Sequence, residues 1–322
     1  MMKTLDVFTF GETMVLFQPD QMMSLEYVHQ FPKRIGGAES NVAIGLTRLG
    51  HSVMWFSKLG NDSFGRYIHK YIRGEGVDTS SCLFTDKAQT GLIFKEQLSP
   101  EDLNVYYYRN GSAASLMEPK DLDETSIASA KILHISGITP ALSETCYATV
   151  MKAIEIAKQN GTKIVFDPNL RLKLWSSEKA KRVFNEIAAS ADVLLPGLDE
   201  GQLMTGKMEV EEVAEALMGD GNKTIIIKLG SKGAYLHTKN EKVYIDGFPV
   251  KQIVDPVGAG DGFAAGIISG ILREDPLHKV VKRANAIGAM VIGVSGDVEG
   301  LPTYAAVEQF MKPDGNIRDV KR

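Results

Sequence analysis

The sequence has little cysteine and no long apolar run. Cys82 and Cys146 are its two cysteines, and neither lies in a CxxC or other ligand-spaced motif. This usage supports neither a disulfide framework nor a zinc site, and it fits a reducing compartment. No stretch reaches the roughly 18 apolar residues of a membrane span, and residues 1–12 lack the apolar core of a signal peptide. We therefore expect a soluble, cytoplasmic protein with no membrane partner.

An excess of charge of one sign is also missing. Lys and Arg number 36 against 40 Asp and Glu, which gives a formal net charge of −4. Such a balance provides no general attraction for nucleic acid or for an anionic membrane. Any anion that the protein binds must be held by local contacts.

The chain also lacks internal repeats, low-complexity tracts and a Pro/Gly/Ser linker long enough to separate two domains. Its 322 residues are 44% hydrophobic, enough for one large core. We predict a single domain over residues 1–322.

From about residue 121 the sequence alternates short β-rich runs with helical patterns. The β-rich runs are 132–136, 163–167, 193–196 and 224–230, and the helical patterns are 143–159, 177–189 and 199–219. The first half adds β-rich runs at 7–12 and 53–60 and helices at about 39–49 and from Asp62 to near Gly76. This alternation predicts parallel βαβ units, so the fold class is α/β with helices on the faces of a mainly parallel sheet.

Two segments interrupt this pattern. Residues from about 14–34 and 90–110 show strand-like alternation and aromatic side chains without intervening helices. They predict antiparallel strands in a small sheet outside the main one. We interpret this small sheet as a lid.

The stretch VDPVGAGDGFAAGIISGIL, residues 254–272, places three small residues before an acid and an apolar helix expected over 262–272. At Gly258, Ala259 and Gly260, main-chain N–H groups can approach a ligand at the positive end of the helix. Fixed donors there would stabilise the charge on a phosphoryl group during its transfer. Asp261 is then placed to accept the proton of an attacking hydroxyl.

A simpler interpretation is that Asp261 only caps the helix and the glycines allow close packing. A helix N-terminus also lowers the pKa of a carboxylate and weakens it as a base. The loose transition state of phosphoryl transfer makes little demand for early deprotonation, so the base role stays open. The sequence has no GxxxxGK[ST] motif, and no GxGxxG follows the first strand, which disfavours a P-loop kinase and a dinucleotide-binding fold.

DPVGAGDGFAAG and GGAESNVAIGLTRLG, residues 36–50, together resemble the paired signatures of the ribokinase-like (PfkB) sugar kinases. The resemblance covers essentially the whole chain. It implies a doubly wound α/β domain with a small β-sheet lid that closes over a sugar, and ATP and Mg²⁺ as cofactors. Because the lid of this family often forms the subunit contact, we expect a homo-oligomer.

VYYYRNGSAAS (105–115), SGITPALS (136–143) and FDPNLRLKLW (166–175) narrow the resemblance to the 2-keto-3-deoxygluconate kinases. Tyr107 and Arg109 share one face of a strand, and Arg171 follows a strand at the sheet edge where ligands bind. The guanidinium groups of the two arginines and the phenol of Tyr107 could bind a substrate carboxylate, because Arg forms bidentate, charge-assisted hydrogen bonds with that group. Ordinary cross-strand contacts, and a surface ion pair for Arg171, are the alternatives.

The resemblance assigns further residues by position. Gly37 and Asn41 would line the sugar hydroxyls, and Asp297 would be a substrate-side carboxylate, although these positions also suit a helix-terminal polar residue and a turn. On the nucleotide side it nominates Lys228, Gly230, Ser231, Gly233, Gly258, Gly260 and Asn285. Residues 230–233 equally resemble an ordinary hairpin turn, and Asn285 a buried helix residue.

Two positions depart from the family pattern. An Asn usually stands three residues before Glu200, where it is linked to the metal and phosphates, but here the residue is Gly197. Glu200 is therefore expected to reach the metal directly or through a water molecule. The subgroup tends to have Tyr where this chain has Ile93, so one sugar hydroxyl contact is missing.

The expected reaction is ATP-dependent phosphorylation of the terminal hydroxyl of 2-keto-3-deoxygluconate, giving the 6-phosphate. A fructokinase or another sugar kinase of the same fold is the first alternative. A catalytically silent sugar-sensing protein and an oxidoreductase are more distant ones.

Overall fold

The computed structural model describes residues 3–99, 102–219 and 221–312. Its central sheet consists of the strands β1 (Leu5–Phe10), β4 (Val53–Phe56), β9 (Ala130–Ser136), β10 (Lys163–Asp167), β11 (Val193–Leu194), β12 (Thr224–Lys228), β13 (Ala234–His237) and β14 (Lys242–Ile245). Their order is β14-β13-β12-β11-β10-β9-β1-β4. Pairs from β4 to β12 are parallel, and β13 and β14 join antiparallel at one edge. The predicted α/β class with a mainly parallel sheet is confirmed.

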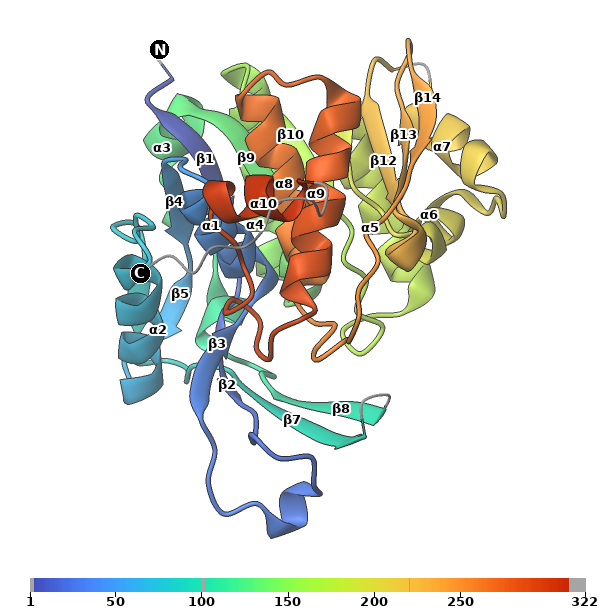
Figure 1. The fold of residues 1–322 in the computed structure, drawn as a ribbon. Helices are drawn as coiled ribbons and strands as arrows, with labels where there is room; N and C mark the ends of the chain where they lie inside the picture. Colours follow the sequence, from blue (N-terminus) through green and yellow to red (C-terminus); the bar gives the residue numbers. More distant parts are fainter. Residues whose placement is uncertain (1–2, 100–101, 220, 313–322) are drawn as a thin grey trace.

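Helices cover both faces of this sheet (Figure 1). One face packs against α1 (Ala38–Arg48), α8 (Ala259–Leu272), α9 (Leu277–Val291) and α10 (Tyr304–Phe310), with α2 (Ser63–Gly74) beside them. The other packs against α3 (Glu124–Ser129), α4 (Glu144–Gln159), α5 (Ser177–Ser190), α6 (Leu198–Thr205) and α7 (Val210–Met218). Each face therefore has its own apolar core, as a parallel sheet requires.

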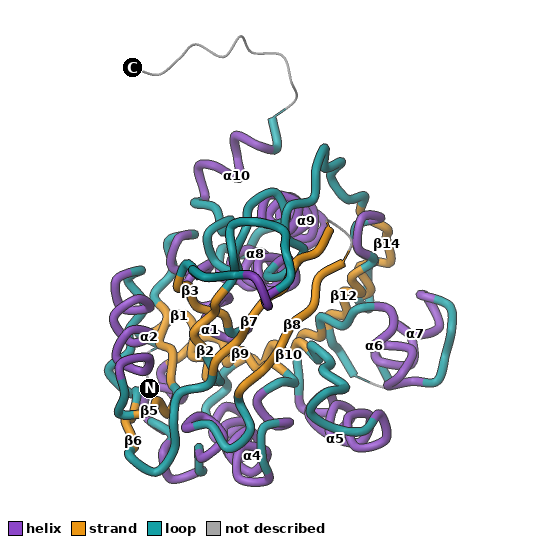
Figure 2. Tube along the Cα trace, turned by 90° about the horizontal axis from the view of Figure 1, so that it is seen from below, coloured by secondary structure: helices purple, strands orange, loops and turns teal. Residues whose placement is uncertain are grey.

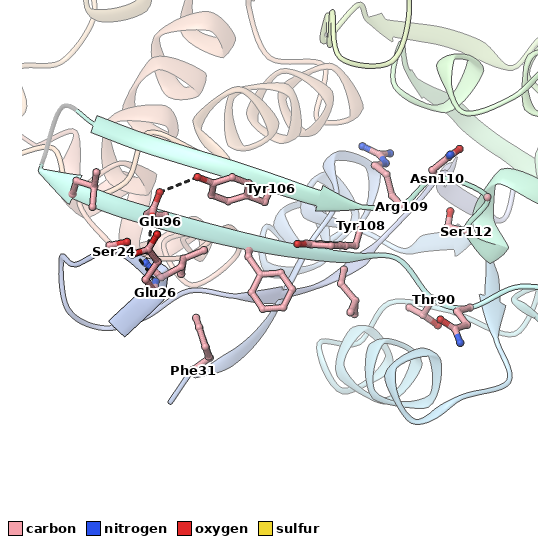
Figure 3. Close-up of a pocket in the computed structure, with 16 residues that line it drawn as sticks. Ser24, Glu26, Phe31, Thr90, Glu96, Tyr106, Tyr108, Arg109, Asn110 and Ser112 are labelled. Atoms are coloured by element: carbon pink, nitrogen blue, oxygen red, sulfur yellow. Dashed lines mark hydrogen bonds between the residues drawn. The ribbon is translucent and has the colours of Figure 1, made fainter. Parts of the chain in front are cut away.

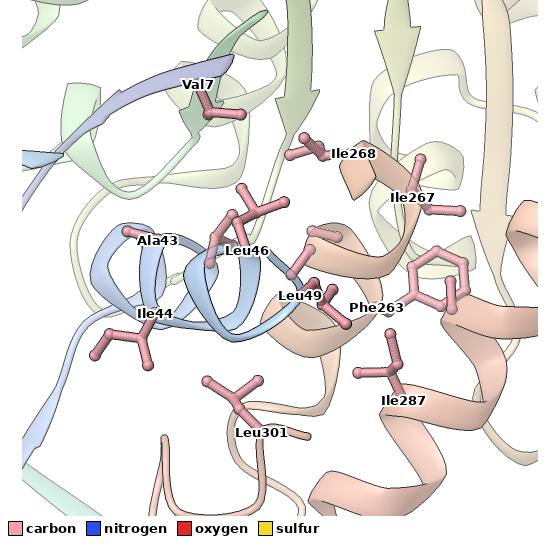
Figure 4. Packing of buried hydrophobic residues seen from close by; sticks show 14 of the residues in the cluster. Val7, Ala43, Ile44, Leu46, Leu49, Phe263, Ile267, Ile268, Ile287 and Leu301 are labelled. Atoms are coloured by element: carbon pink, nitrogen blue, oxygen red, sulfur yellow. The ribbon is translucent and has the colours of Figure 1, made fainter. Parts of the chain in front are cut away.

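Helix α8 lies in the middle of the first of these cores. Figure 4 shows Ile268 of α8 on the side of α1 and Val7 of β1, and Ile267 on the side of Phe263. Most of α8 is buried, from Asp261 to Gly270, because α1, α9 and the sheet surround it. The start of α8 is therefore held on a rigid element.

Short 3₁₀ turns connect several of these elements. They are η1 (Leu25–Tyr27), η2 (Ala113–Leu116), η3 (Pro119–Asp121), η4 (Thr139–Ala141) and η5 (Gly230–Lys232). The last of them lies in the connection between β12 and β13. The hairpin alternative for residues 230–233 is thus correct, since these two strands pair antiparallel.

Three expected boundaries are wrong. The helix predicted over 199–219 is two helices, because Gly206 adopts a left-handed conformation (φ 77°) and ends α6. The run 53–60 divides into β4 and β5 (Lys58–Gly60), and β5 pairs with β6 (Leu83–Thr85) in a separate sheet. Helix α8 begins at Ala259 rather than at residue 262.

The predicted lid strands form a second sheet. They are β3 (Lys33–Gly36), β2 (Met14–Phe17), β7 (Leu92–Ser99) and β8 (Asp102–Tyr108), in that order. The pairs β2–β3 and β7–β8 are antiparallel as expected, but β2 and β7 pair parallel. The expectation of a wholly antiparallel sheet is wrong, because both strands leave the main domain in the same direction.

The lid lies beyond the carboxyl ends of the parallel strands, where open α/β sheets bind ligands (Figures 1 and 2). Figure 2, seen from below, shows β7 and β8 crossing in front of the main sheet. Within the described residues no helix combines the length and apolarity needed to cross a bilayer.

Candidate active site

The glycine-rich turn leads directly into α8. Gly258 is the N-cap residue, with a left-handed φ of 84°, and Asp261 lies in the first helical turn. A Cβ at position 258 would lie 2.5 Å from the carbonyl oxygen of Asp297, so only glycine fits there. Asp261 is therefore not the N-cap. The N–H groups of the first turn have no acceptor in the described chain, which leaves them for a ligand anion.

Asp261 is buried and hydrogen-bonded by two amides. Asn41 Nδ2 of α1 donates to Asp261 Oδ2 at 2.7 Å, and Asn169 Nδ2 lies 3.5 Å from Oδ1. Burial raises the pKa of Asp261 to about 7; the Asn41 bond opposes this rise and Asp167 adds to it. The expected lowering of this pKa is wrong, because desolvation of the buried carboxylate raises it. A carboxylate that titrates near neutral pH suits a general base.

One cavity of about 300 Å³ lies between the lid and Asp261. It is lined by all six residues predicted for the substrate: Gly37, Asn41, Tyr107, Arg109, Arg171 and Asp297. Gly258, Gly260 and Asp261 line it as well. We call this cavity the sugar pocket.

A second cavity of about 420 Å³ lies on the other side of the turn and is mostly apolar. It is lined by six residues of the predicted nucleotide site and turn: Lys228, Gly230, Ser231, Gly233, Gly260 and Asn285. Ala259 lines it too, and Lys228, Pro256 and Gly260 line both cavities. We call it the nucleotide pocket. The two pockets meet at the start of α8, so a group bound in one can reach a group bound in the other.

Lys228 provides a cation at this junction. Its Nζ lies 2.9 and 2.8 Å from the two carboxylate oxygens of Asp167, at the end of β10. Burial opposes its charge, but the nearby carboxylates, Asp167 foremost, outweigh that effect and raise the pKa of Lys228. Lys228 is therefore charged near neutral pH and can attract a phosphate.

Glu200 makes two hydrogen bonds with the main chain. Its Oε1 accepts from Leu170 N and its Oε2 from Gly197 N, each at 2.7 Å. Gly197 is the N-cap of α6, and Glu200 makes the half of a capping box in which the third helical residue accepts from the N-cap N–H; the half that an Asn side chain at 197 could have made is absent. Each carboxylate oxygen keeps a free lone pair, which fits the expected contact with a metal-bound water.

No group of three acidic, His or Cys side chains within the described residues could cage a metal ion. This fits Mg²⁺, which usually keeps several waters and binds through one or two carboxylates plus phosphate oxygens. Glu200 and Asp167 are acids that lie near Lys228.

The three residues of the proposed carboxylate clamp differ in their surroundings. Arg109 has a side chain that is 9% exposed, and it forms an ion pair with Glu12, which Ser112 also contacts. Tyr107 is half-exposed, and its ring lies 5.6 Å from the Arg109 guanidinium carbon. Arg171 is exposed and has no ion-pair partner in the described part of the chain, so the surface ion pair considered for it is absent. Arg171 is thus the cation left for a substrate anion.

Two further predicted residues have structural roles as well. Gly37 is the N-cap of α1, and a Cβ there would lie 2.4 Å from the carbonyl oxygen of Glu12. Asn285 Nδ2 donates to the carbonyl oxygens of Ile245 and Asp246 at 3.1 and 3.0 Å. Asn285 is therefore a buried helix residue that also lines the nucleotide pocket.

Sequence reasoning missed several residues of the site. Asp167 lies at the end of a predicted strand, inside a segment singled out only for Arg171, so its position could have identified it. Glu12 and Lys95 carried no signal, since their partners are distant in sequence. Asn169, with a positive φ of 40°, holds a main-chain conformation that no pattern revealed.

An α/β domain whose lid covers a pocket joined to a second cavity is an arrangement typical of group-transfer enzymes. The chain matches the pfkB family carbohydrate kinase model over residues 4–304, and it belongs to that family. It is therefore a carbohydrate kinase.

Three relatives illustrate this membership. The 2-dehydro-3-deoxygluconokinase of Bacillus subtilis is 39% identical over 319 residues, which cover 98% of each chain. A PfkB protein from Polaromonas sp. JS666 is 42% identical with a TM-score of 0.86, over 95% of this chain and 99% of that one. A candidate ribokinase II from E. coli, solved with ATP and Mg²⁺, is 26% identical with a TM-score of 0.89, over 95% and 99%.

Proposed function

We propose that this enzyme transfers the terminal phosphoryl group of ATP to the terminal hydroxyl of 2-keto-3-deoxygluconate. The observation that carries the proposal is the junction of the two pockets at Gly260 and Lys228, next to a buried acid whose pKa lies near 7. The likeness to 2-dehydro-3-deoxygluconokinase supports the choice of sugar. 2-Dehydro- and 2-keto-3-deoxygluconate are the same compound.

In this reaction the sugar lies in the sugar pocket with its terminal hydroxyl at Asp261. The carboxylate orients the hydroxyl and takes its proton as the oxygen attacks phosphorus. The bond from phosphorus to the bridging oxygen of ATP breaks, and ADP leaves. The N–H groups at the start of α8 and the ammonium of Lys228 stabilise the charge on the transferring group.

ATP would lie in the nucleotide pocket with its phosphates at the start of α8. Mg²⁺ would neutralise phosphate charge, with Glu200 holding it through water. The lid, by covering the sugar pocket, would exclude water as a competing acceptor.

A coupled ADP-release assay over a panel of keto-deoxy acids, ketoses and nucleosides tests the proposal. We expect 2-keto-3-deoxygluconate to give the highest kcat/KM. A preference for fructose would support the fructokinase alternative. Sugar binding without ATP turnover would support the sensing protein, and binding of NAD(P) the oxidoreductase.

Replacing Arg171 should discriminate between acidic and neutral sugars. A charge-assisted hydrogen bond contributes roughly 1.5–3 kcal/mol, so Arg171→Ala should raise KM for the keto acid about ten- to a hundredfold. KM for a neutral ketose should stay unchanged. Arg109→Ala should act in the same direction, and its ion pair with Glu12 makes it the less specific test.

Lys173→Ala is the matched control, because Lys173 is a nearby cation whose Nζ donates to Val105 O and which does not line the sugar pocket. KM values are measured for both sugars in each variant. Equal effects of Arg171→Ala on the acidic and the neutral sugar would refute the carboxylate clamp.

We also propose that residues 1–322 act as one kinase unit and that two copies associate through their lids. A cavity on the lid is lined by Leu98, Tyr106 and Tyr108, all exposed, and by Phe31 (Figure 3). Exposed aromatic and aliphatic side chains gathered on one face are typical of interaction surfaces. The hydroxyl of Tyr106 donates a hydrogen bond to Glu96, so this polar group needs no partner from a second copy.

Tyr108→Glu should weaken this association, because it places a charge at the centre of the contact. We expect the wild type to show a multiple of the 35.2 kDa chain mass in light scattering, and the variant to shift toward the monomer. Met208→Glu changes an equally exposed residue between α6 and α7 and should leave the mass unchanged. A wild-type monomer, or an unaltered Tyr108→Glu oligomer, would refute the lid contact.

A further inference from the structure

A lysine of the lid is buried against two acids of the main domain. Lys95, on β7, has a side chain only 2% exposed. Its Nζ lies 2.9 Å from Asp255 Oδ2 and 2.8 Å from Asp297 Oδ1. Burial opposes its charge, but Asp297 and Asp255 outweigh that effect and raise the pKa of Lys95. A buried ammonium is tolerated only where carboxylates compensate it, so the three groups form a unit.

The first acid holds the turn before α8. Asp255 Oδ1 accepts from Val257 N at 3.0 Å, and Oδ2 lies 3.4 Å from Gly296 N and 3.3 Å from Gln18 Nε2. Asp255 thus connects the turn that leads to Gly258 with the loop after α9. Any shift of its carboxylate would move the turn at the pocket junction.

The second acid belongs to the sugar pocket. Asp297 lines that pocket, and a Cβ built on Gly36 would lie 2.7 Å from Asp297 Oδ2. Lys95 contacts the other oxygen, Oδ1. The lysine therefore fixes the orientation of a carboxylate whose free oxygen is available for a sugar hydroxyl.

The lid strand places Lys95 and a pocket residue on one face. Ile93 and Lys95 are two residues apart on β7, so both side chains point to the same side of the lid. Ile93 lines the sugar pocket. Arg34 of β3 lies close by, but it bonds Ser295 and Gln18 and pairs weakly with Asp20 and Glu299. Of the cations in the described residues, Lys95 alone pairs with Asp255 or Asp297.

We propose that Lys95 is a positioning residue that couples the lid to both substrate-binding Asp297 and the turn at the start of α8. The inference rests on the proposed function and on the expected role of Asp297 as a substrate-side carboxylate. The lid then does more than cover the sugar, because its lysine sets the geometry of the acids beneath it. Asp297 binds a hydroxyl in a fixed orientation only while Lys95 occupies this position.

Lys95→Met tests this coupling, since it keeps an unbranched side chain only one atom shorter and removes its charge. A displacement of about 1 Å can cost a hundredfold in rate, so kcat/KM for the sugar should fall by roughly that factor. KM for ATP should rise less than KM for the sugar, because neither Lys95 nor its two acids line the nucleotide pocket and only the turn reaches the phosphates. Lys95→Arg, which restores a cation, should recover part of the loss.

Lys58→Met is the matched control. Lys58 is also largely buried, pairs with Asp121 at 2.6 Å and lines neither pocket. It should lose thermal stability without any change in KM for the sugar. All variants are assayed with whichever sugar the wild type phosphorylates best, so an error in the proposed substrate leaves this test intact.

Three results would overturn the proposal. They are a kcat/KM for the sugar close to wild type in Lys95→Met, equal effects of Lys95→Met on KM for the sugar and KM for ATP, and the same sugar-specific effect in Lys58→Met. Should Lys95→Met fail to fold, Lys95→Gln, which keeps an N–H donor without charge, is judged by the same criteria. A selective loss toward the sugar in that variant supports the coupling, and an unselective one refutes it.

Discussion

Asp261→Asn is expected to lower kcat by roughly two to four powers of ten while leaving KM for sugar and ATP nearly unchanged. Asparagine has the shape of aspartate, and its amide oxygen can still accept the bond that Asn41 Nδ2 donates at 2.7 Å. It cannot take a proton from the sugar hydroxyl. Steady-state kinetics with both substrates varied measure the effect. A variant with near-wild-type kcat would remove Asp261 from the mechanism.

The pH profile gives a second readout of the same variant. Because the pKa of Asp261 is raised to about 7, kcat/KM of the wild type should rise with pH and level off above that value. The charged groups that bear on Asp261 include Asp167, Arg171, Asp297, Lys228 and Glu39. Asp261→Asn should lose this acid limb from its residual activity.

Glu39 needs a separate control, because burial raises its pKa to about 7 as well. It is fully buried on α1 and accepts a hydrogen bond from Thr139 Oγ1 at 2.6 Å, and it does not line the sugar pocket. Glu39→Gln should therefore keep the acid limb. If Glu39→Gln lost the acid limb and Asp261→Asn kept it, the titrating group would be Glu39 and not Asp261.

Asp261→Asn should be more stable than the wild type at alkaline pH, although it is less active. The folded pKa of Asp261, about 7, lies above the ordinary value of 3.8, so the folded state disfavours the ionised carboxylate. This cost is absent below the ordinary pKa, grows as the pH rises to about 7, and is complete above it. Asp261→Asn should therefore melt at a higher temperature than the wild type at alkaline pH, and the difference should vanish in acid. A lower Tm at alkaline pH would contradict this assignment.

Patterns local in sequence predicted most of the fold. Alternating β-rich and helical runs gave the parallel sheet and most of its helices, and Asp62 correctly marked the start of α2, whose Phe64 and Gly65 N–H groups it caps. The parallel pairing of β2 with β7 could not be predicted, because it depends on where the chain re-enters the lid. The break between α6 and α7 depends on the conformation of one glycine, Gly206.

The site divides in the same way. Local sequence located the turn, Asp261 and the three clamp residues, and the family resemblance supplied most of the other residues that line the two pockets. The ion pairs Lys228–Asp167, Arg109–Glu12 and Lys95–Asp297 join segments far apart in the chain, so no spacing reveals them. The sign of the pKa shift at Asp261 also needed the structure, since burial is a property of the assembled core.

Gly258→Ala should lower kcat about a hundredfold, because it displaces the start of α8 from the phosphoryl group. An alanine in the left-handed region costs ~1 kcal/mol, which alone is a modest loss of stability. At φ 84° the added Cβ would also lie 2.5 Å from the carbonyl oxygen of Asp297, so the turn or that loop must move. A shift of about 1 Å at a group that stabilises the transition state is enough for the expected loss.

Gly206→Ala separates the two effects. Gly206 has a similar φ of 77°, and a Cβ there would meet nothing within 4 Å, so only the conformational cost remains. Both variants should lose some thermal stability, and Gly206→Ala should retain wild-type kcat. Melting curves and kcat at saturating sugar and ATP are compared for the pair. Two results would contradict this role of the main-chain donors at the start of α8. One is a wild-type kcat in Gly258→Ala, and the other is a kcat in Gly206→Ala that falls as far as that of Gly258→Ala.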